Sequence, residues 1–144
     1  MRKNSGFTLM EVMVTIAIIG ILCGIATPNF VKWLPRHRVG SAARELKSTL
    51  EFARISAIKT NADVTVNFNW EPPSVTVVDS DGTTLRTRGL PVDVRFDDID
   101  LGVSVTFNAH GFASKSGWVA VENVKDGTIN RIIKLTLGGN TSID

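Results

Sequence analysis

The chain has 144 residues, of which 16 are Lys or Arg and 14 are Asp or Glu, so its formal net charge is +2. This length is typical of one folded domain with an additional N-terminal segment. The single cysteine, Cys23, excludes an internal disulfide bond and a cluster of thiolate metal ligands. The sequence contains no Walker-type loop, no GxGxxG after a strand and no GxSxG elbow, so no motif indicates an enzyme.

The N-terminus combines a short basic leader with a long apolar run. Residues 1–6 read MRKNSG, and no charged residue occurs between Val12 and Val31. A helix of this length and composition can cross a bilayer core of about 30 Å. Because the leader is basic, the positive-inside tendency predicts that the N-terminus stays in the cytoplasm. We therefore expect a transmembrane helix over residues 7–28.

Several residues of this segment carry specific expectations. Glu11 is a lone carboxylate in apolar surroundings, where a charge costs about 2.5–3.5 kcal/mol, so we expect a functional role and a partner of opposite charge. Thr8 and Glu11 fall in the first helical turn, where an acidic side chain complements the helix dipole. Gly20 and Gly24 share one helix face that could admit a neighbouring helix. Pro28 removes one backbone hydrogen bond and can kink the helix.

Residues 29–60 are predicted to form an amphipathic neck helix. Apolar residues recur at spacings of three and four, which places them on one face that would pack against the head. Residues 32–59 carry seven Lys or Arg against two Glu, a net charge of +5. This charge suits contact with anionic lipid or an acidic neighbour, and a solvated helix face is the alternative. Trp33 could anchor at the membrane interface or pack on the head. The apolar stripe consists of Val39, Ala42, Ala43, Leu46, Leu50, Ala53 and Ala57.

After the neck, the apolar pattern changes from helical spacing to alternation, which predicts β-strands. Turn signals such as Asp81-Gly82 and Asp126-Gly127 separate the strands. We expect an antiparallel β-meander of roughly six to eight strands, with residues 89–102 as a loop or short edge piece and residues 140–144 as a tail. The predicted fold class is α+β, a long N-terminal helix packed on a β-rich head over residues 61–144.

The head shows no arrangement of residues that indicates catalysis. Residues 60–144 carry seven basic against eleven acidic residues, a net charge of −4. The acidic stretch Asp93–Asp100 could offer oxygen ligands to calcium, but it lacks the spacing of an EF-hand, and a solvated loop is the simpler interpretation. His37 and His110 are far apart, and no nucleophile and base can be paired. We expect no catalytic site, no cofactor and no metal site.

The stretch G-F-T-L-M-E, followed by an apolar run and Pro28, resembles the class III leader of type IV pilins and type II secretion pseudopilins. In that family a prepilin peptidase cleaves after the glycine, here Gly6, and methylates the new N-terminal residue, here Phe7. The resemblance implies that Glu11 corresponds to the family's glutamate. The amino group of Phe7, on the same or a neighbouring subunit, can neutralise Glu11 once helices bundle away from water.

The head is similar to the GspH/FimT group, which comprises the minor pseudopilin H of type II secretion and FimT-like minor pilins. The similar stretches read AARELKSTLEFARISAI and VTFNAHGFAS. Minor subunits of this kind are thought to lie at or near a filament tip and to prime assembly. The positions that carry the likeness are Leu46, Leu50, Ala53, Arg54, Ala57, Ile58, Phe107 and Gly111.

The resemblance implies a minor pseudopilin of the bacterial inner membrane, with a cytoplasmic N-terminus and a periplasmic head. Its implied partners are prepilin peptidase, the inner-membrane assembly platform and other pilin or pseudopilin subunits. The alternative is a FimT-like minor pilin of a type IV pilus. Some FimT-like members bind DNA through a C-terminal Gly-Arg motif, but the stretch that begins at Leu137 reads LGGNTS and has no arginine. Because phosphate contacts need Lys or Arg and the head is acidic, we do not expect nucleic-acid binding.

Overall fold

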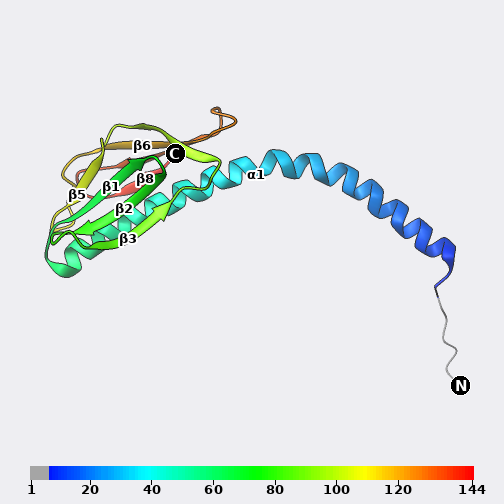
Figure 1. Cartoon of the computed structure of the whole chain (residues 1–144), viewed down its shortest axis with the longest axis horizontal. Helices are drawn as coiled ribbons and strands as arrows, with labels where there is room; N and C mark the ends of the chain where they lie inside the picture. Colours follow the sequence, from blue (N-terminus) through cyan, green and yellow to red (C-terminus); the bar gives the residue numbers. More distant parts are fainter. Residues whose placement is uncertain (1–6) are drawn as a thin grey trace, which may run out of the picture. The chain divides into compact units, whose positions relative to one another are not determined.

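The computed structural model of the chain describes residues 7–144, apart from the side chains of residues 26–29 and 31–32. The chain divides into two compact units, Met1–Leu34 and Pro35–Asp144. Both units contain part of the 52-residue helix α1 (Leu9–Thr60), which Figure 1 draws from blue to green.

The first unit consists of the N-terminal part of α1. The helix is assigned without a break through Pro28 and Pro35, and the kink expected at Pro28 stays a prediction. Over the described part of the chain, no helix has both the length and the apolar character that crossing a membrane requires. The membrane span expected over residues 7–28 therefore also stays a prediction.

Helix α1 ends where the sequence predicts, at the start of the segment Asn61-Ala62-Asp63. Asn61 adopts a left-handed conformation, with φ of 52°. The amide of Asn61 donates to the carbonyl of Ile58 at 3.4 Å, and the amide of Ala62 donates to the carbonyl of Ala57 at 3.2 Å. These two bonds form the Schellman arrangement, which satisfies carbonyls that the helix leaves without a partner.

The second unit contains two antiparallel sheets of four strands each. The strands are β1 (Val64–Trp70), β2 (Pro73–Asp79), β3 (Thr84–Gly89), β4 (Val94–Ile99), β5 (Ser104–Phe107), β6 (Gly117–Asn123), β7 (Asn130–Leu135) and β8 (Thr141–Ile143). The strand order is β3-β2-β1-β5 in one sheet and β4-β6-β7-β8 in the other. A long N-terminal helix with an antiparallel β head confirms the predicted fold class.

One local expectation is met in one of its two forms, and a second is wrong. The segment 89–102, expected as a loop or short edge piece, contains β4, a strand of six residues at the edge of its sheet. Val94 and Phe96 of β4 are buried and pair with β6. The alternation in this strand is short, because it rests on Val94 and Phe96 on either side of Arg95 before the pair Asp97-Asp98 interrupts it. The predicted tail contains β8, in which Ile143 pairs with Ile133 of β7.

The strands also do not follow one continuous meander. The strand after β3 crosses to the other sheet, and β5 returns to pair with β1. Strand β3 stands at the end of the strand order, so it forms an edge of its sheet, and it is exposed along nearly its whole length. Sequence alternation predicts which residues form strands, but it does not predict which strands become neighbours.

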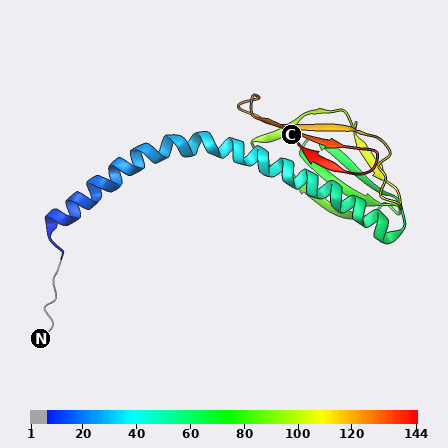
Figure 2. The ribbon, with the colours of Figure 1, turned by 180° about the vertical axis from the view of Figure 1, so that it is seen from behind.

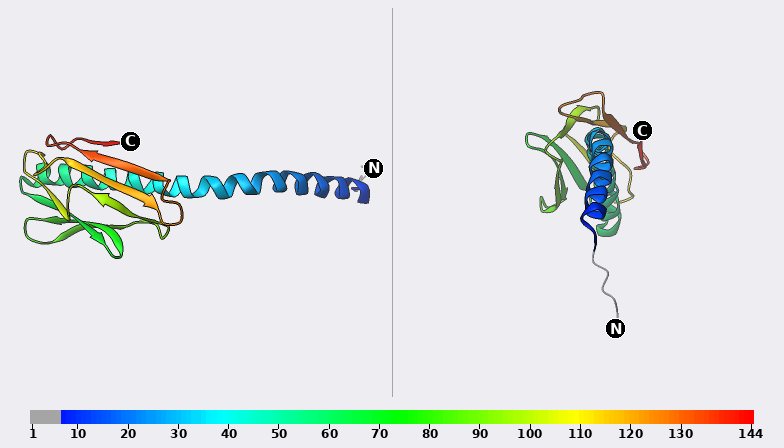
Figure 3. Two further views of the ribbon diagram at one scale, coloured as in Figure 1. Left: turned by 90° about the horizontal axis from the view of Figure 1, so that it is seen from above. Right: turned by 90° about the vertical axis from the view of Figure 1, so that its right-hand side faces the viewer.

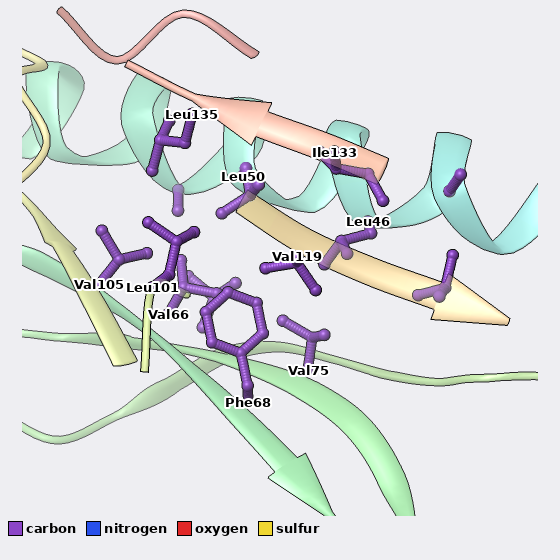
Figure 4. Packing of buried hydrophobic residues seen from close by; sticks show 14 of the residues in the cluster. Leu46, Leu50, Val66, Phe68, Val75, Leu101, Val105, Val119, Ile133 and Leu135 are labelled. Carbon is purple, nitrogen blue, oxygen red and sulfur yellow. The ribbon is translucent and has the colours of Figure 1, made fainter. Parts of the chain in front are cut away.

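The core of the second unit lies between the C-terminal part of α1 and the two sheets. Figures 2 and 3 show this part of the helix running along the strands. All seven residues of the predicted apolar stripe are buried, from Val39 to Ala57. In Figure 4, Leu46 and Leu50 extend from the helix toward Val119 and Ile133 of the β4-β6-β7-β8 sheet. Burial of this stripe supplies the apolar contact that holds helix and sheets together.

A tightly packed junction connects the end of α1 with two turns, and we call it the Arg54 junction (Arg54, Gly111, Gly139 and Asn140). The Nη1 atom of Arg54 donates to the carbonyl of Gly139 at 3.3 Å and to Oδ1 of Asn140 at 3.0 Å. Its Nε atom is buried without a hydrogen-bond partner among the described residues. A Cβ built on Gly139 would lie 2.3 Å from the carbonyl oxygen of Gly111. The backbones of the two turns are therefore in direct contact with each other, next to the side chain of Arg54.

Candidate functional site

The N-terminal turn of α1 is organised by Thr8. The backbone amide of Glu11 donates to Oγ1 of Thr8 at 3.2 Å, and the amide of Val12 donates to the carbonyl of Thr8 at 3.3 Å. Thr8 is thus an N-cap, which satisfies a backbone donor that the helix itself leaves free. The sequence Thr8-x-x-Glu11 also has the spacing of a capping box, which is a signal for this cap in the sequence itself.

The cap determines where Glu11 lies. Because α1 begins at Leu9, Glu11 occupies the first turn, where its carboxylate complements the positive end of the helix dipole. The side chain is exposed, and Phe7 lies just outside the helix with 85% of its surface exposed. Gly6 lies outside the described residues. The structure therefore places Phe7 and Glu11 within one turn of each other at the accessible start of α1.

The rest of this segment presents apolar side chains on all sides of the helix. Monomeric soluble proteins rarely expose contiguous apolar patches of more than a few hundred Å². An apolar surface that surrounds a helix needs lipid or other helices to cover it. The exposed apolar side chains of this region are Phe7, Leu9, Met10, Val12, Met13, Val14, Ile16, Ile18, Ile19, Ile21, Leu22, Ile25 and Phe30.

Gly20 and Gly24 leave open space on this surface. A Cβ built on either glycine would meet no described atom within 4 Å outside the adjacent part of its own helix. Such open positions suit the close approach of a neighbouring helix, and this packing role stays a prediction. The side chain of Pro28 lies outside the described set. Trp33 is 52% exposed, and its ring lies 6.0 Å from that of Phe30.

The acidic stretch of the head does not assemble into a set of metal ligands. Asp93 forms an ion pair with Arg38 of α1, and Oδ1 of Asp98 accepts the backbone amide of Ile99 at 2.7 Å. Within the described residues, no group of three or more His, Cys, Asp or Glu is placed to hold a metal ion. His110 lies in a turn, where its amide donates to Oδ1 of Asn108 at 3.0 Å.

The ion pairs of the head were not predicted from the sequence. Arg95 on β4 contacts Glu122 on β6 at 2.7 Å, and Arg88 on β3 contacts Glu45 on α1 at 2.8 Å. The partners in each pair lie far apart in sequence, so spacing alone gives no signal for them. Glu122 is mostly buried, and its pairing with Arg95 compensates its charge. These pairs connect strands and helix and indicate a structural role.

Two family models match the chain. The prokaryotic N-terminal methylation motif matches residues 1–27. The model described as type II transport protein GspH matches residues 42–139, well over half of the chain. The first match covers the capped start of α1 with its apolar surface, and the second covers the C-terminal part of α1 and strands β1 to β7.

Curated relatives agree with both matches. The type IV major pilin protein PilA of Myxococcus xanthus is 50% identical over 46 residues, which are 32% of this chain and 21% of that protein. A fimbrial protein of Pseudomonas aeruginosa is 27% identical over 143 residues, covering 99% of this chain and 75% of the relative. The chain thus aligns with about a fifth of the first relative and three quarters of the second.

Solved structures show the same fold. The type IV minor pilin FimU of Pseudomonas aeruginosa matches with a TM-score of 0.65 and 18% identity, covering 76% of this chain and 90% of that chain. The minor pseudopilin EpsH from the Type 2 Secretion System of Vibrio cholerae matches with a TM-score of 0.60 and 10% identity, covering 74% and 96%. At identities of 18% and 10%, what these structures share with this chain is the arrangement of helix and sheets.

Proposed function

This chain belongs to the GspH family of type II transport proteins, within the pilins and pseudopilins, and from this premise we propose that it is a minor pseudopilin. In this role it is a structural subunit that enters the pseudopilus of a type II secretion system, at or near the tip, and supports protein secretion. Members of the family are structural subunits. We accordingly assign no catalytic residue to this chain.

The observation that carries the proposal is the exposed, capped start of α1. Thr8 fixes Phe7 and Glu11 at the end of an apolar helix that no other part of the described chain covers. Such a helix suits lipid before assembly and neighbouring helices afterwards. We infer a subunit anchored in the inner membrane, with its head in the periplasm, that the assembly platform transfers into a filament.

Processing of the N-terminus provides the direct test of this function. The methylation motif over residues 1–27 supports cleavage after Gly6 and methylation of Phe7 by prepilin peptidase. Mass spectrometry of the membrane protein from cells that contain the peptidase should find a mature chain that begins at Phe7 and carries one additional methyl group. The same chain from cells without the peptidase is the control and should keep residues 1–6. An intact leader in both strains would contradict the proposal.

A minor pilin of a type IV pilus is the second candidate function. It is favoured by the fimbrial protein of Pseudomonas aeruginosa, which aligns with 99% of this chain, and by the fold of FimU. The two functions differ in the proteins that accompany the subunit. Co-purification with other pseudopilins and a secretin would support the secretion system, whereas co-purification with a major pilin would support the pilus.

DNA capture by the head is expected to be absent. The turn that contains Gly139 has no arginine of its own, and Arg54, which reaches it from α1, already donates to the carbonyl of that glycine. A bound guanidinium and an acidic head offer few phosphate contacts. The protein should therefore produce no salt-sensitive mobility shift with duplex DNA at micromolar concentration. A shift that salt abolishes would instead support a DNA-binding minor pilin.

A further inference from the structure

A hollow of about 340 Å³ lies between the β6–β7 hairpin and the stretch of α1 with which the second unit begins. Helix α1 contributes Arg36 and Val39 to its lining, and the hairpin contributes residues 128–131, TINR. Its volume falls at the lower end of the range for small-molecule sites, so it can hold a polar group larger than a single ion. None of these residues has a part in the processing or assembly segment described above.

The charge of this hollow favours an anion. Arg36 and Arg131 both line it and both are exposed, while no carboxylate occurs among the described lining residues. A guanidinium has five N–H donors in a planar fork that matches phosphate oxygens. Nη1 of Arg131 donates to the carbonyl of Asn130 at 3.2 Å, which leaves the remaining donors of that fork for a ligand.

One carboxylate lies next to the hollow and opposes this preference. Asp126 accepts hydrogen bonds at Oδ1 from the hydroxyl of Thr128 at 2.6 Å and from its amide at 3.1 Å. These bonds, with a smaller contribution from the charge of Arg36, lower the pKa of Asp126. Asp126 is therefore ionised at neutral pH, and its charge weakens the attraction of the two arginines for an anion. Lys125, which is exposed beside it, acts in the opposite direction.

The position of Arg36 limits where such an anion can come from. Arg36 follows Val31, the end of the uncharged run, by five residues. Even a fully extended chain of five residues spans at most about 18 Å. If the apolar run lies in the membrane, as the proposed function requires, the hollow stays within that distance of the lipid headgroups, whatever the orientation of the head. We propose that this hollow binds the phosphate group of an anionic phospholipid.

The test uses the full-length protein in a non-ionic detergent and titrates it with phosphatidylglycerol or phosphatidylcholine, with bound lipid counted by native mass spectrometry. Wild-type protein should bind phosphatidylglycerol in preference to phosphatidylcholine. The double variant R36Q/R131Q should bind phosphatidylglycerol at least tenfold more weakly. The control R44Q/K115Q removes the same charge from exposed residues outside the hollow and should bind like wild type.

A third variant and a competitor sharpen the result. D126N removes the opposing charge and should tighten binding by roughly threefold, as expected for one exposed charge. Equal binding of phosphatidylglycerol by wild type and R36Q/R131Q would overturn the proposal. Inorganic phosphate that binds as tightly as the lipid would also overturn it, because the site would then be one for free phosphate. The titration needs neither the peptidase nor a filament, so it remains informative if the proposed assembly function fails.

Discussion

Replacing Gly139 with alanine should destabilise the head by about 3 kcal/mol or more. Gly139 has a φ of +74°, and an added Cβ would lie 2.3 Å from the carbonyl oxygen of Gly111, with Nε of Arg54 at 2.9 Å. The backbone atom cannot rotate away as a side chain could, so the two turns must separate. Their separation would also disturb the hydrogen bond from Arg54 to the carbonyl of Gly139.

Gly82 provides a matched control because it has nearly the same backbone conformation without the crowding. Its φ is +81°, and an added Cβ would meet nothing within 4 Å. Gly82→Ala should therefore cost only the left-handed strain, about 1 kcal/mol. Urea unfolding of the full-length protein in detergent, followed by tryptophan fluorescence, measures both variants. Equal losses in the two would show that the Arg54 junction is not tightly packed in solution.

The sequence predicted the neck helix better than the sheets of the head. Every residue of the neck stripe, from Val39 to Ala57, is buried, because a helix repeats its apolar face at a spacing that the sequence displays directly. The end of the helix at Asn61 could also be predicted, since asparagine tolerates the left-handed conformation that the C-terminus adopts. These features depend on neighbours in sequence.

The missed features depend on residues that are distant in sequence. Strand β4 pairs with β6, and the stability of this pairing comes from partners such as Val121, more than twenty residues away. The Arg54 junction joins residues 54, 111 and 139, and nothing near Arg54 indicates that two turns meet there. Such contacts arise from the sheet topology, which alternation does not specify.

The assembly segment is a different case, because its chemistry is local. Thr8 and Glu11 share one helical turn, so the capped start that the structure shows could have been predicted from the Thr-x-x-Glu spacing. The expected partner of Glu11 is the amine of Phe7, which would arise only on cleavage after Gly6, so the described contacts of the chain do not include it. The roles of Gly6, Phe7 and Glu11 therefore stay predictions, to be tested by analysis of the N-terminus and by incorporation of variants into the filament.

Glu11→Val should leave membrane insertion intact and lower incorporation into the filament on the order of a hundredfold or more. Removal of a charge from an apolar segment favours insertion. In the assembled bundle, however, it leaves the amine of Phe7 buried without a partner, and breaking a buried pair in this way costs about 3–5 kcal/mol, where each 1.4 kcal/mol is about tenfold. Immunoblots of the membrane and filament fractions would measure the two quantities separately.

Two further substitutions decide whether charge or packing causes the loss. Glu11→Gln keeps the length of the side chain and removes its charge, so it should behave like Glu11→Val. Thr15→Val lies one turn later and removes only the hydroxyl that donates to the carbonyl of Glu11 at 2.7 Å. It should assemble like wild type, because that carbonyl keeps its place in the helix. Normal incorporation of Glu11→Gln beside a defective Glu11→Val would mean that the side chain acts by its length or its hydrogen bonding, and the proposed charge pairing with the amine of Phe7 would be wrong.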